Sequence, residues 1–246
     1  MRKSKYLVFN SFYFNFNDDL SEIKEIKELF ENQNILDLER FNKLISIKEN
    51  QFEFYNLNFL YLPKNIEIMG KYVFLNNQIQ LLDLSNCINL KYIGEYSFKE
   101  NQIKQLKLPK NIEIIDNFAF SNNQIEILDL SQYMNLKIIG FFAFENNQIK
   151  QLKLNSNIQH IYTEAFENNQ IEILDLSQCV NLKHVSIHAF FKNPLKEIKI
   201  LNDINIGYID KYKGDRWNDF SIYYNKTRKH KGHYKYETYE WEWYRL

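Results

Sequence analysis

The chain has no excess of charge of either sign. Lysine and arginine together number 31 among its 246 residues, aspartate and glutamate also number 31, and the formal net charge is zero. The charge balance therefore gives no support for binding to nucleic acid or to a membrane surface. No apolar run approaches the about 20 residues that a membrane-spanning helix needs, so no membrane span is expected.

Motifs for catalysis and for metal binding are also missing from the sequence. We find no nucleophile with a base, no phosphate-binding loop and no paired-carboxylate signature. His184 and His188 lie four residues apart, and His230 and His233 lie three apart, but neither pair has a third ligand nearby or an HExxH context. The sequence predicts no enzyme, no cofactor and no metal site.

Two segments with basic residues have ordinary interpretations. The run KTRKHKGHYK at 226–235 is followed at once by Glu237, Glu240 and Glu242, which argues against a nucleic-acid site. The start, MRKSKYLVFNSFYFNFNDDL, is basic, but polar residues interrupt its apolar stretch and no small-residue cleavage site follows. It is a poor secretion signal, which favours a cytoplasmic location over an exported one.

A four-residue motif recurs through most of the chain. It reads NNQI at 76–79, ENQI at 100–103, NNQI at 122–125, 146–149 and 168–171, and KNPL at 192–195. The closing apolar residues are spaced alternately 24 and 22 residues apart. A period in the twenties is typical of a solenoid, whose units cannot bury a core alone and stack on their neighbours. The alternation indicates that the building block is a pair of turns, one long and one short.

Each turn carries apolar residues at fixed offsets, and about eight turns span residues 31–216. An LxL segment in every turn predicts a strand with one buried face, and stacked turns place these strands in parallel about 4.8 Å apart. The return path has room for one helical or 3-10 turn around segments such as GEYSFKEN and DNFAFSNN. A phenylalanine of each return path is expected to stack behind the sheet. These residues are Phe52, Phe74, Phe98, Phe120, Phe144, Phe166 and Phe190.

Glycine recurs four residues before some of these phenylalanines, at Gly70, Gly94 and Gly140. These positions predict either a positive φ or a tight approach between neighbouring turns. Other turns have Asp116, Tyr162 or Ser186 there, so a positive φ is not obligatory.

The apolar pattern LxxLxLxxC resembles the leucine-rich-repeat signature, and LPKNIEIIDNFAFSNNQI is similar to the bacterial surface-antigen (BspA-type) class of that repeat. The segment WNDFSIYYNKTRKHKGHYKYETYEWEW resembles the terminal segment of spirochaete-like members, with its middle altered to KHKGHYKY. The resemblance implies an α/β repeat solenoid: a right-handed leucine-rich-repeat arc with one parallel sheet on its concave face and short helical or 3-10 turns on its convex face. It implies adhesion or protein recognition and brings no catalytic residues.

Both ends of the repeats are expected to carry caps, because an exposed strand edge invites pairing with other chains. Residues 1–30 are assigned to an N-terminal cap, with FYFNF as a strand over the first sheet edge and a helix from Asp19 to Phe30. Residues 31–216 hold the repeats, and residues 217–246 form a C-terminal cap. In that cap a helix from Trp217 to Asn225 precedes a strand containing Tyr234, Tyr236 and Trp241.

The two cysteines occupy the same offset in turns four apart. Four strand spacings separate Cys87 from Cys179 by about 19 Å, far beyond the roughly 7 Å that a disulfide allows. Both are expected to be unpaired core residues.

Two columns of side chains should project from the concave sheet face. The centres of the LxL segments are mostly charged, and their sign alternates from Asp83 onwards, which predicts either a recognition stripe or pairs that neutralise each other and fix the register. The second column, two residues earlier, is largely apolar, and an exposed apolar patch of this kind usually marks an interaction site. The first column is Asp37, Tyr61, Asp83, Lys107, Asp129, Lys153, Asp175 and Lys199. The second column is Ile35, Phe59, Leu81, Gln105, Ile127, Gln151, Ile173 and Glu197.

A third column lies on the convex side, two residues before each stacked phenylalanine. It can either pack between adjacent turns or form a second adhesive surface. Its members are Tyr72, Tyr96, Phe118, Phe142, Glu164 and His188.

Two functions are consistent with these observations. In the first, the concave face of a monomer binds a protein or peptide, with adhesion as one such role. In the second, the array is a structural or self-associating surface or scaffold element. The hypothesis of a binding face assigns the site to Ile35, Phe59, Tyr61, Leu81, Asp83, Gln105, Lys107, Ile127, Asp129, Gln151, Lys153, Ile173 and Asp175.

Overall fold

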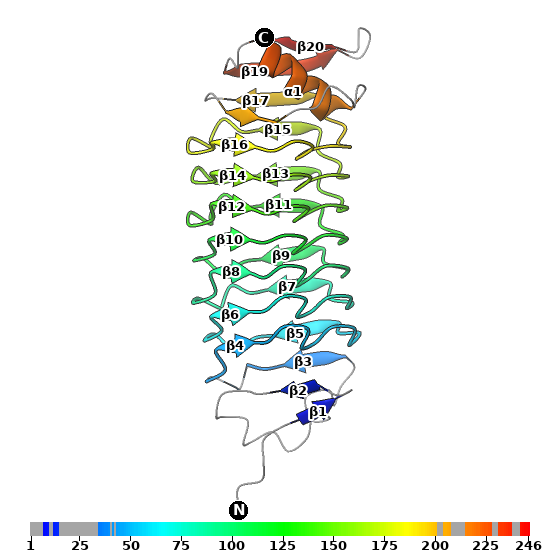
Figure 1. The fold of residues 1–246 in the computed structure, drawn as a ribbon, viewed down its shortest axis with the longest axis vertical. Helices are drawn as coiled ribbons and strands as arrows, with labels where there is room; N and C mark the ends of the chain where they lie inside the picture. The colour runs from blue at the N-terminus through cyan, green and yellow to red at the C-terminus, as the bar shows by residue number, and fades with distance from the viewer. Residues whose placement is uncertain are drawn as a thin grey trace, which may run out of the picture.

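The computed structural model describes residues 7–9, 12–14, 34–39, 41, 43–200, 204–207, 215–227, 231–237 and 242–246. The described turns stack along one nearly straight axis, from the blue N-terminal end to the red C-terminal end (Figure 1). Two rows of strands run the length of this column. The helix expected from Asp19 to Phe30 lies outside the described residues.

The first row consists of the predicted LxL strands, one per turn. Most of these strands bury the central leucine or isoleucine, which is partly buried in the strands of Leu106 and Leu152, and the flanking residues are more exposed, as the period of two requires. The strands are β3 (Ile35–Asp37), β5 (Phe59–Tyr61), β7 (Leu81–Asp83), β9 (Gln105–Lys107), β11 (Ile127–Asp129), β13 (Gln151–Lys153), β15 (Ile173–Asp175) and β17 (Glu197–Ile200).

The first row follows the sequence order and is parallel, but its hydrogen-bonded ladder is not continuous. Strands pair as β3 with β5, β7 with β9, β11 with β13 and β15 with β17, always across a 24-residue step. Between these pairs, across the 22-residue steps, the ladder is interrupted. The single continuous sheet expected from the sequence is therefore a series of two-stranded units.

One interruption has a visible cause. Within a pair, the Leu84 amide donates to the Lys107 carbonyl oxygen at 2.9 Å. At the equivalent position of the next turn, the Leu108 amide donates instead to the Tyr133 hydroxyl at 3.0 Å. The hydroxyl of a core side chain thus accepts the hydrogen bond from the amide that would otherwise bond to the next strand.

A second row of strands lies beside the first, each only two residues long. Six of them form a continuous parallel sheet, while β4 and β6 pair separately. Sequence analysis did not predict this row. Its members are β4 (Ser46–Ile47), β6 (Ile68–Met69), β8 (Tyr92–Ile93), β10 (Ile114–Ile115), β12 (Ile138–Ile139), β14 (His160–Ile161), β16 (His184–Val185) and β18 (Asn205–Ile206).

The return paths contain tight turns in place of the expected helical or 3-10 turns. In the segment GEYSFKEN, Tyr96 has a φ of 59° and Glu100 a φ of 56°. These left-handed residues are spaced four apart in every turn from Tyr72 to Lys192. With them, the amides of Tyr96, Phe98 and Glu100 donate to carbonyl oxygens of the next turn at 2.9–3.0 Å. Alternate amides of the segment therefore join one turn to the next, while the Ser97 and Lys99 amides donate to the Gly94 and Tyr96 carbonyl oxygens three residues earlier, at 3.2 Å.

The phenylalanine column is buried as predicted. All seven rings are at most 2% exposed, and neighbouring centroids lie 5.1–5.6 Å apart in stacked geometry. Next to the column, a Cβ on Gly94 would lie 2.6 Å from the Gly70 carbonyl oxygen of the preceding turn. The repeated glycine therefore allows the backbones of neighbouring turns to approach each other closely.

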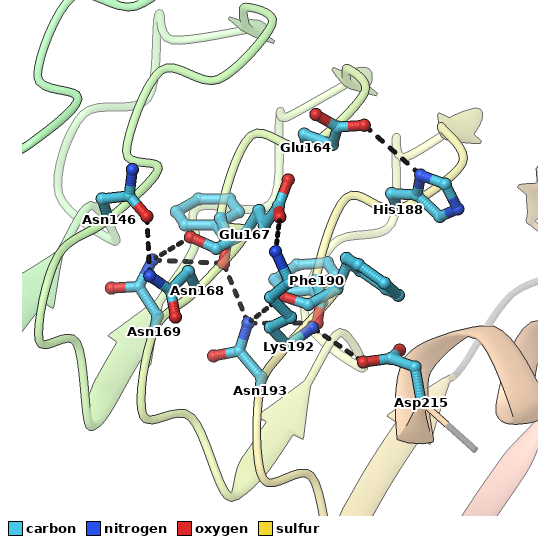
Figure 2. Close-up of polar contacts among 12 residues, drawn as sticks. Asn146, Glu164, Glu167, Asn168, Asn169, His188, Phe190, Lys192, Asn193 and Asp215 are labelled. Carbon is cyan, nitrogen blue, oxygen red and sulfur yellow. Dashed lines mark hydrogen bonds and ion pairs between the residues drawn. The ribbon is translucent and has the colours of Figure 1, made fainter. Parts of the chain in front are cut away.

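A row of buried asparagines joins the turns from within. Each is the second asparagine of NNQI or its equivalent, and each bonds to backbone groups of its own and neighbouring turns. Asn123 Nδ2 donates to the Phe98 and Phe120 carbonyl oxygens at 2.9 and 3.1 Å, and its Oδ1 accepts from the Ile103 amide at 2.9 Å. Figure 2 shows Asn169 and Asn193 of the same row. We call Asn77, Asn101, Asn123, Asn147, Asn169 and Asn193 the asparagine ladder.

Cys87 and Cys179 are buried and unpaired, as predicted. Burial, and to a lesser extent a nearby aspartate, raises the pKa of the Cys87 thiol to about 11 and that of Cys179 to about 12. Both thiols therefore remain protonated and unreactive at neutral pH.

At the N-terminal end, the predicted strand is present as β2 (Phe12–Phe14). It pairs antiparallel with β1 (Leu7–Phe9) in a two-stranded sheet of its own.

At the C-terminal end, the predicted helix is α1 (Arg216–Lys226), and it covers the last turn. The Trp217 ring lies edge-on to Phe190, the last ring of the column, with centroids 4.9 Å apart. The Asp215 side chain caps the helix and also accepts from the Lys192 amide at 2.7 Å (Figure 2). β19 (Gly232–Glu237) then pairs antiparallel with β17, and β20 (Glu242–Arg245) pairs with β19. Tyr234 and Tyr236 lie in β19 as predicted, while Trp241 is outside the described residues.

Removal of residues 217–246 is expected to lower the melting temperature and to cause aggregation. The deletion exposes the Phe190 ring and the edge of β17, and such an edge pairs readily with other chains. Thermal unfolding and light scattering measure both effects. A truncated protein that stays monodisperse with an unchanged melting temperature would contradict the capping role.

Candidate functional site

The outward side chains of the first strand row form a long surface that we call the first-row face. It corresponds to the concave face expected from the sequence. Because the strands are short and regular, each contributes two outward positions, and the same two positions recur in every turn. The residues assigned to the candidate site all lie on this surface.

The apolar column of the first-row face is exposed along most of its length. Phe59 is 47% exposed, Leu81 51%, Ile127 62% and Ile173 54%. Ile35 is half-buried at the N-terminal end. Gln105 and Gln151 occupy the intervening positions and are also exposed. A row of large apolar side chains that are about half exposed to solvent is typical of a binding surface.

The charged column consists of neutralised pairs. Lys107 Nζ lies 3.0 Å from Asp83, Lys153 Nζ lies 3.4 Å from Asp129, and Lys199 Nζ lies 4.0 Å from Asp175. Each pair joins the two strands of one hydrogen-bonded unit. The pairs of opposite charge expected from the sequence are therefore present, and exposed pairs of this kind contribute about 0–1 kcal/mol each.

Serines fix the aspartates of these pairs. Ser131 donates to Asp129 Oδ1 through its amide and its hydroxyl, and the other two aspartates have the same arrangement. The Ser131 hydroxyl lowers the pKa of the Asp129 carboxyl most, against a smaller opposing effect of burial, and the Ser131 amide and Lys153 lower it further. The carboxylate thus stays ionised at neutral pH and is already fully engaged within the chain.

The N-terminal part of the first-row face is its most apolar part. Phe59, Tyr61 and Leu81 are all exposed and lie on the consecutive strands β5 and β7. Tyr61 stands where later turns have a lysine, so this part lacks the ion pair that follows at Asp83 and Lys107. An aromatic pair beside an aliphatic side chain is the composition of many binding hot spots.

The second strand row has an outer face that sequence analysis missed. Ile68 and Tyr92 are exposed on it, and Ile88 and Met134 project from the loops between the two rows. A strand of two residues is too short to show the alternation of apolar and polar residues by which a strand is recognised in a sequence. Four of these strands have an apolar residue one position before the buried one, namely Ile68, Tyr92, Ile114 and Ile138, and this was the available signal.

The aromatic column of the return paths packs between turns. The Tyr72 and Tyr96 ring centroids are 4.7 Å apart, those of Tyr96 and Phe118 4.6 Å, and those of Phe118 and Phe142 4.5 Å. In the later turns Glu164 and His188 continue the column through a 3.3 Å contact (Figure 2). These rings are only partly exposed, which favours the packing interpretation over a second adhesive surface.

The histidines singled out in the sequence do not converge. His188 contacts Glu164, His184 lies 2.9 Å from the Ser186 hydroxyl, and His233 lies 3.0 Å from Glu197. His230 is outside the described residues. Within the described part of the chain, no group of three or more histidine, cysteine or acidic side chains is placed to hold a metal ion. In the same residues, no helix has the length and apolarity needed to cross a bilayer.

Comparisons with known proteins agree with the repeat architecture. A profile of the BspA-type leucine-rich repeat region matches residues 24–135 and 130–213, in six copies. A search of the curated proteins found no match. Among solved structures, a leucine-rich repeat protein from Bacteroides ovatus is similar, with 17% sequence identity and a TM-score of 0.37. The similarity covers 67% of this chain and 55% of that one, so the chain spans about half the length of this solved relative.

Proposed function

This chain belongs to the BspA-type leucine-rich repeat family, and from that premise we propose that it is a recognition module whose first-row face binds a protein or peptide. The exposed apolar column, Ile35 to Ile173, is the observation that carries the proposal. Its side chains lie on a regular strand scaffold, so a partner can remove them from water without ordering a flexible loop. Repeat arrays of this kind typically act by presenting a surface.

The apolar column is expected to contribute more to binding than the charged column. Desolvated aromatic and aliphatic side chains provide most of the energy of an interface, whereas exposed ion pairs contribute little. The aspartates are also bound already to serine and lysine side chains of the same face, so a partner gains little by contacting them.

A double substitution tests this ranking. Phe59→Ser with Leu81→Ser is expected to weaken partner binding by tenfold or more while leaving the fold intact, because both side chains project into solvent. Affinity capture with the purified protein identifies the partner, and calorimetry with the isolated partner measures the affinity. Circular dichroism and the melting temperature verify that the fold is unchanged.

Two controls make the result specific to the first-row face. Ile68→Ser with Ile88→Ser removes exposed apolar side chains of similar size from the second row and should leave the affinity unchanged. Asp129→Asn should have a small effect that depends on salt concentration. A strong loss from Asp129→Asn with a neutral apolar pair would contradict the proposal and indicate an electrostatic ligand.

The alternative is a structural or self-associating element. The exposed side chains of the second row favour it, because they give the column a second apolar strip besides the first-row face. Analytical ultracentrifugation distinguishes the two functions. The structural role would be favoured if the protein assembles in a concentration-dependent way, and if Ile68→Ser abolishes this assembly while Phe59→Ser does not.

A further inference from the structure

A polar cavity of about 350 Å³ lies beside the second strand row, outside the first-row face. Three of its lining residues, Lys91, Glu113 and Lys137, each come one residue before a strand of that row, and Asn111 and Asn135 complete the lining. The strands concerned are β8, β10 and β12, in the middle of the column (Figure 1). The volume lies within the range of about 300–1,000 Å³ that is usual for small-molecule sites. We call this site the second-row cavity.

Several side chains of the second-row cavity are held in place by the chain itself. Asn111 Nδ2 donates to the Ile88 carbonyl oxygen at 2.9 Å, and Asn135 Nδ2 donates to Asn111 Oδ1 at 3.3 Å. Lys91 Nζ lies 3.0 Å from Glu113 Oε1, so this ion pair orients both of its members. Polar groups that are positioned before binding lose less conformational entropy when a ligand arrives.

Hydrogen-bond donors and acceptors are mixed within the cavity. Each asparagine amide has two N–H donors and a carbonyl oxygen with two lone pairs, and the bonds just described use only some of them. The two lysine ammonium groups add donors, and the Glu113 carboxylate adds acceptors. A hydroxyl group donates and accepts at the same time. A ligand with several neighbouring hydroxyl groups therefore matches this lining.

The charges and the polarity of the lining argue against the other classes of small ligand. The Glu113 carboxylate repels an anion, and the ammonium groups of Lys91 and Lys137 repel a cation. All five lining side chains end in polar groups, whereas sites for apolar ligands are lined mainly by apolar side chains. The class that fits is a neutral ligand with many hydroxyl groups, and sugars are biological molecules of this kind.

We propose that the second-row cavity binds a neutral sugar unit of an oligosaccharide. Asn135 and Glu113 accept hydrogen bonds from the sugar hydroxyls, and Lys137 donates to them. Four of the five lining residues are exposed and Glu113 is half-buried, so a sugar chain reaches the cavity from solvent without movement of the backbone. This site is separate from the first-row face and does not depend on the partner proposed for that face.

An array of immobilised oligosaccharides tests the class of ligand. The array carries neutral oligosaccharides of glucose, galactose, mannose and N-acetylglucosamine beside sulfated forms of the same chains. The fluorescently labelled full chain should bind one of the neutral oligosaccharides at least tenfold more strongly than its sulfated form. Calorimetry with that neutral oligosaccharide in solution then measures the affinity.

Matched variants assign the binding to the second-row cavity. Asn135→Ala should weaken binding of the neutral oligosaccharide about tenfold. Asn181→Ala should leave it unchanged, because Asn181 makes the equivalent bond to Asn157 Oδ1, at 2.9 Å, two turns further along the column. Phe59→Ser with Leu81→Ser, on the first-row face, should also leave it unchanged. Melting temperatures verify that the variants are folded.

Glu113→Gln tests the charge argument directly. The variant keeps the shape of the side chain but removes the carboxylate of the cavity, so that the two lysines remain without it. Sulfated oligosaccharides should then bind at least tenfold more tightly than they bind to the unaltered protein, because the anion is no longer repelled.

Three results with the array and the asparagine variants would each overturn the sugar proposal: no binding of the neutral oligosaccharides, stronger binding of the sulfated forms, or an equal loss from Asn135→Ala and Asn181→Ala. Unchanged binding of sulfated oligosaccharides by Glu113→Gln would also overturn it, since charge would then not select the ligand. These outcomes leave the proposed function of the first-row face untouched, because that function is tested at Phe59 and Leu81.

Discussion

Replacing Asn123 of the asparagine ladder with leucine is expected to lower the free energy of unfolding by about 2–5 kcal/mol. The substitution keeps the branched shape of the side chain but replaces its amide with two larger methyl groups. The Ile103 amide then loses its partner in the interior, and the Phe98 carbonyl oxygen keeps only the 3.3 Å bond from Asn101. An unsatisfied buried polar group costs about 1–3 kcal/mol, and each lost bond adds to this cost. Urea unfolding followed by circular dichroism measures the change.

The same substitution at an exposed asparagine is the control. Asn111 donates to the Ile88 carbonyl oxygen at 2.9 Å, but on the surface, where water replaces the lost bond. Asn111→Leu should therefore change the stability by less than about 1 kcal/mol. If both substitutions cost the same, the asparagine ladder has no special role in joining the turns.

Truncation of Phe120 to alanine should cost about 3–5 kcal/mol, the typical cost of emptying a buried aromatic site. Its ring is fully buried between Phe98 and Phe144, with centroid distances of 5.5 and 5.4 Å, so no solvent-exposed neighbour can fill the space. Both stacking contacts are lost with the ring, and each aromatic pair contributes about 0.5–1.5 kcal/mol beyond its buried area.

Phe118→Ala provides the comparison for this result. Phe118 also stacks on two rings, but it is partly exposed and belongs to the aromatic column of the return path. Its φ of 55° is as unfavourable for alanine as for phenylalanine, so the substitution reports only the loss of the ring. We expect a smaller cost, about 1–2 kcal/mol. A larger effect at Phe118 than at Phe120 would mean that the return path, and not the phenylalanine column, carries the stability of the stack.

The apolar period was sufficient to predict the first strand row and the phenylalanine column. Each of these depends on which side chains are buried, and burial is what a hydrophobic pattern records. The second strand row escaped prediction because two residues are too few to show a period. The asparagine ladder was not predicted because adjacent asparagines such as Asn122 and Asn123 cannot be told apart in the sequence. In the structure Asn122 is partly exposed and Asn123 is buried.

The interruptions of the first row depend on backbone hydrogen bonds, which a side-chain pattern does not record. Whether the Leu108 amide bonds to a strand or to Tyr133 is decided by the path of the chain after each strand. For the candidate site, the sequence predicted the two outward columns of the first-row face and the alternation of charge. It offered the Asp–Lys pairing as one of two interpretations, but it did not indicate the serine hydrogen bonds that hold the aspartates.

The pairing of strands across 24-residue steps limits how such a gene can grow or shrink. Loss of one turn, for example the turn of β9, would bring Asp83 beside Asp129 and leave two carboxylates where an ion pair stood. Loss of a pair of turns restores Asp beside Lys and keeps every ladder bond in register. Duplications and deletions within this repeat array should therefore be tolerated in steps of 46 residues, a restriction that comes from the backbone pairing and the charge alternation together.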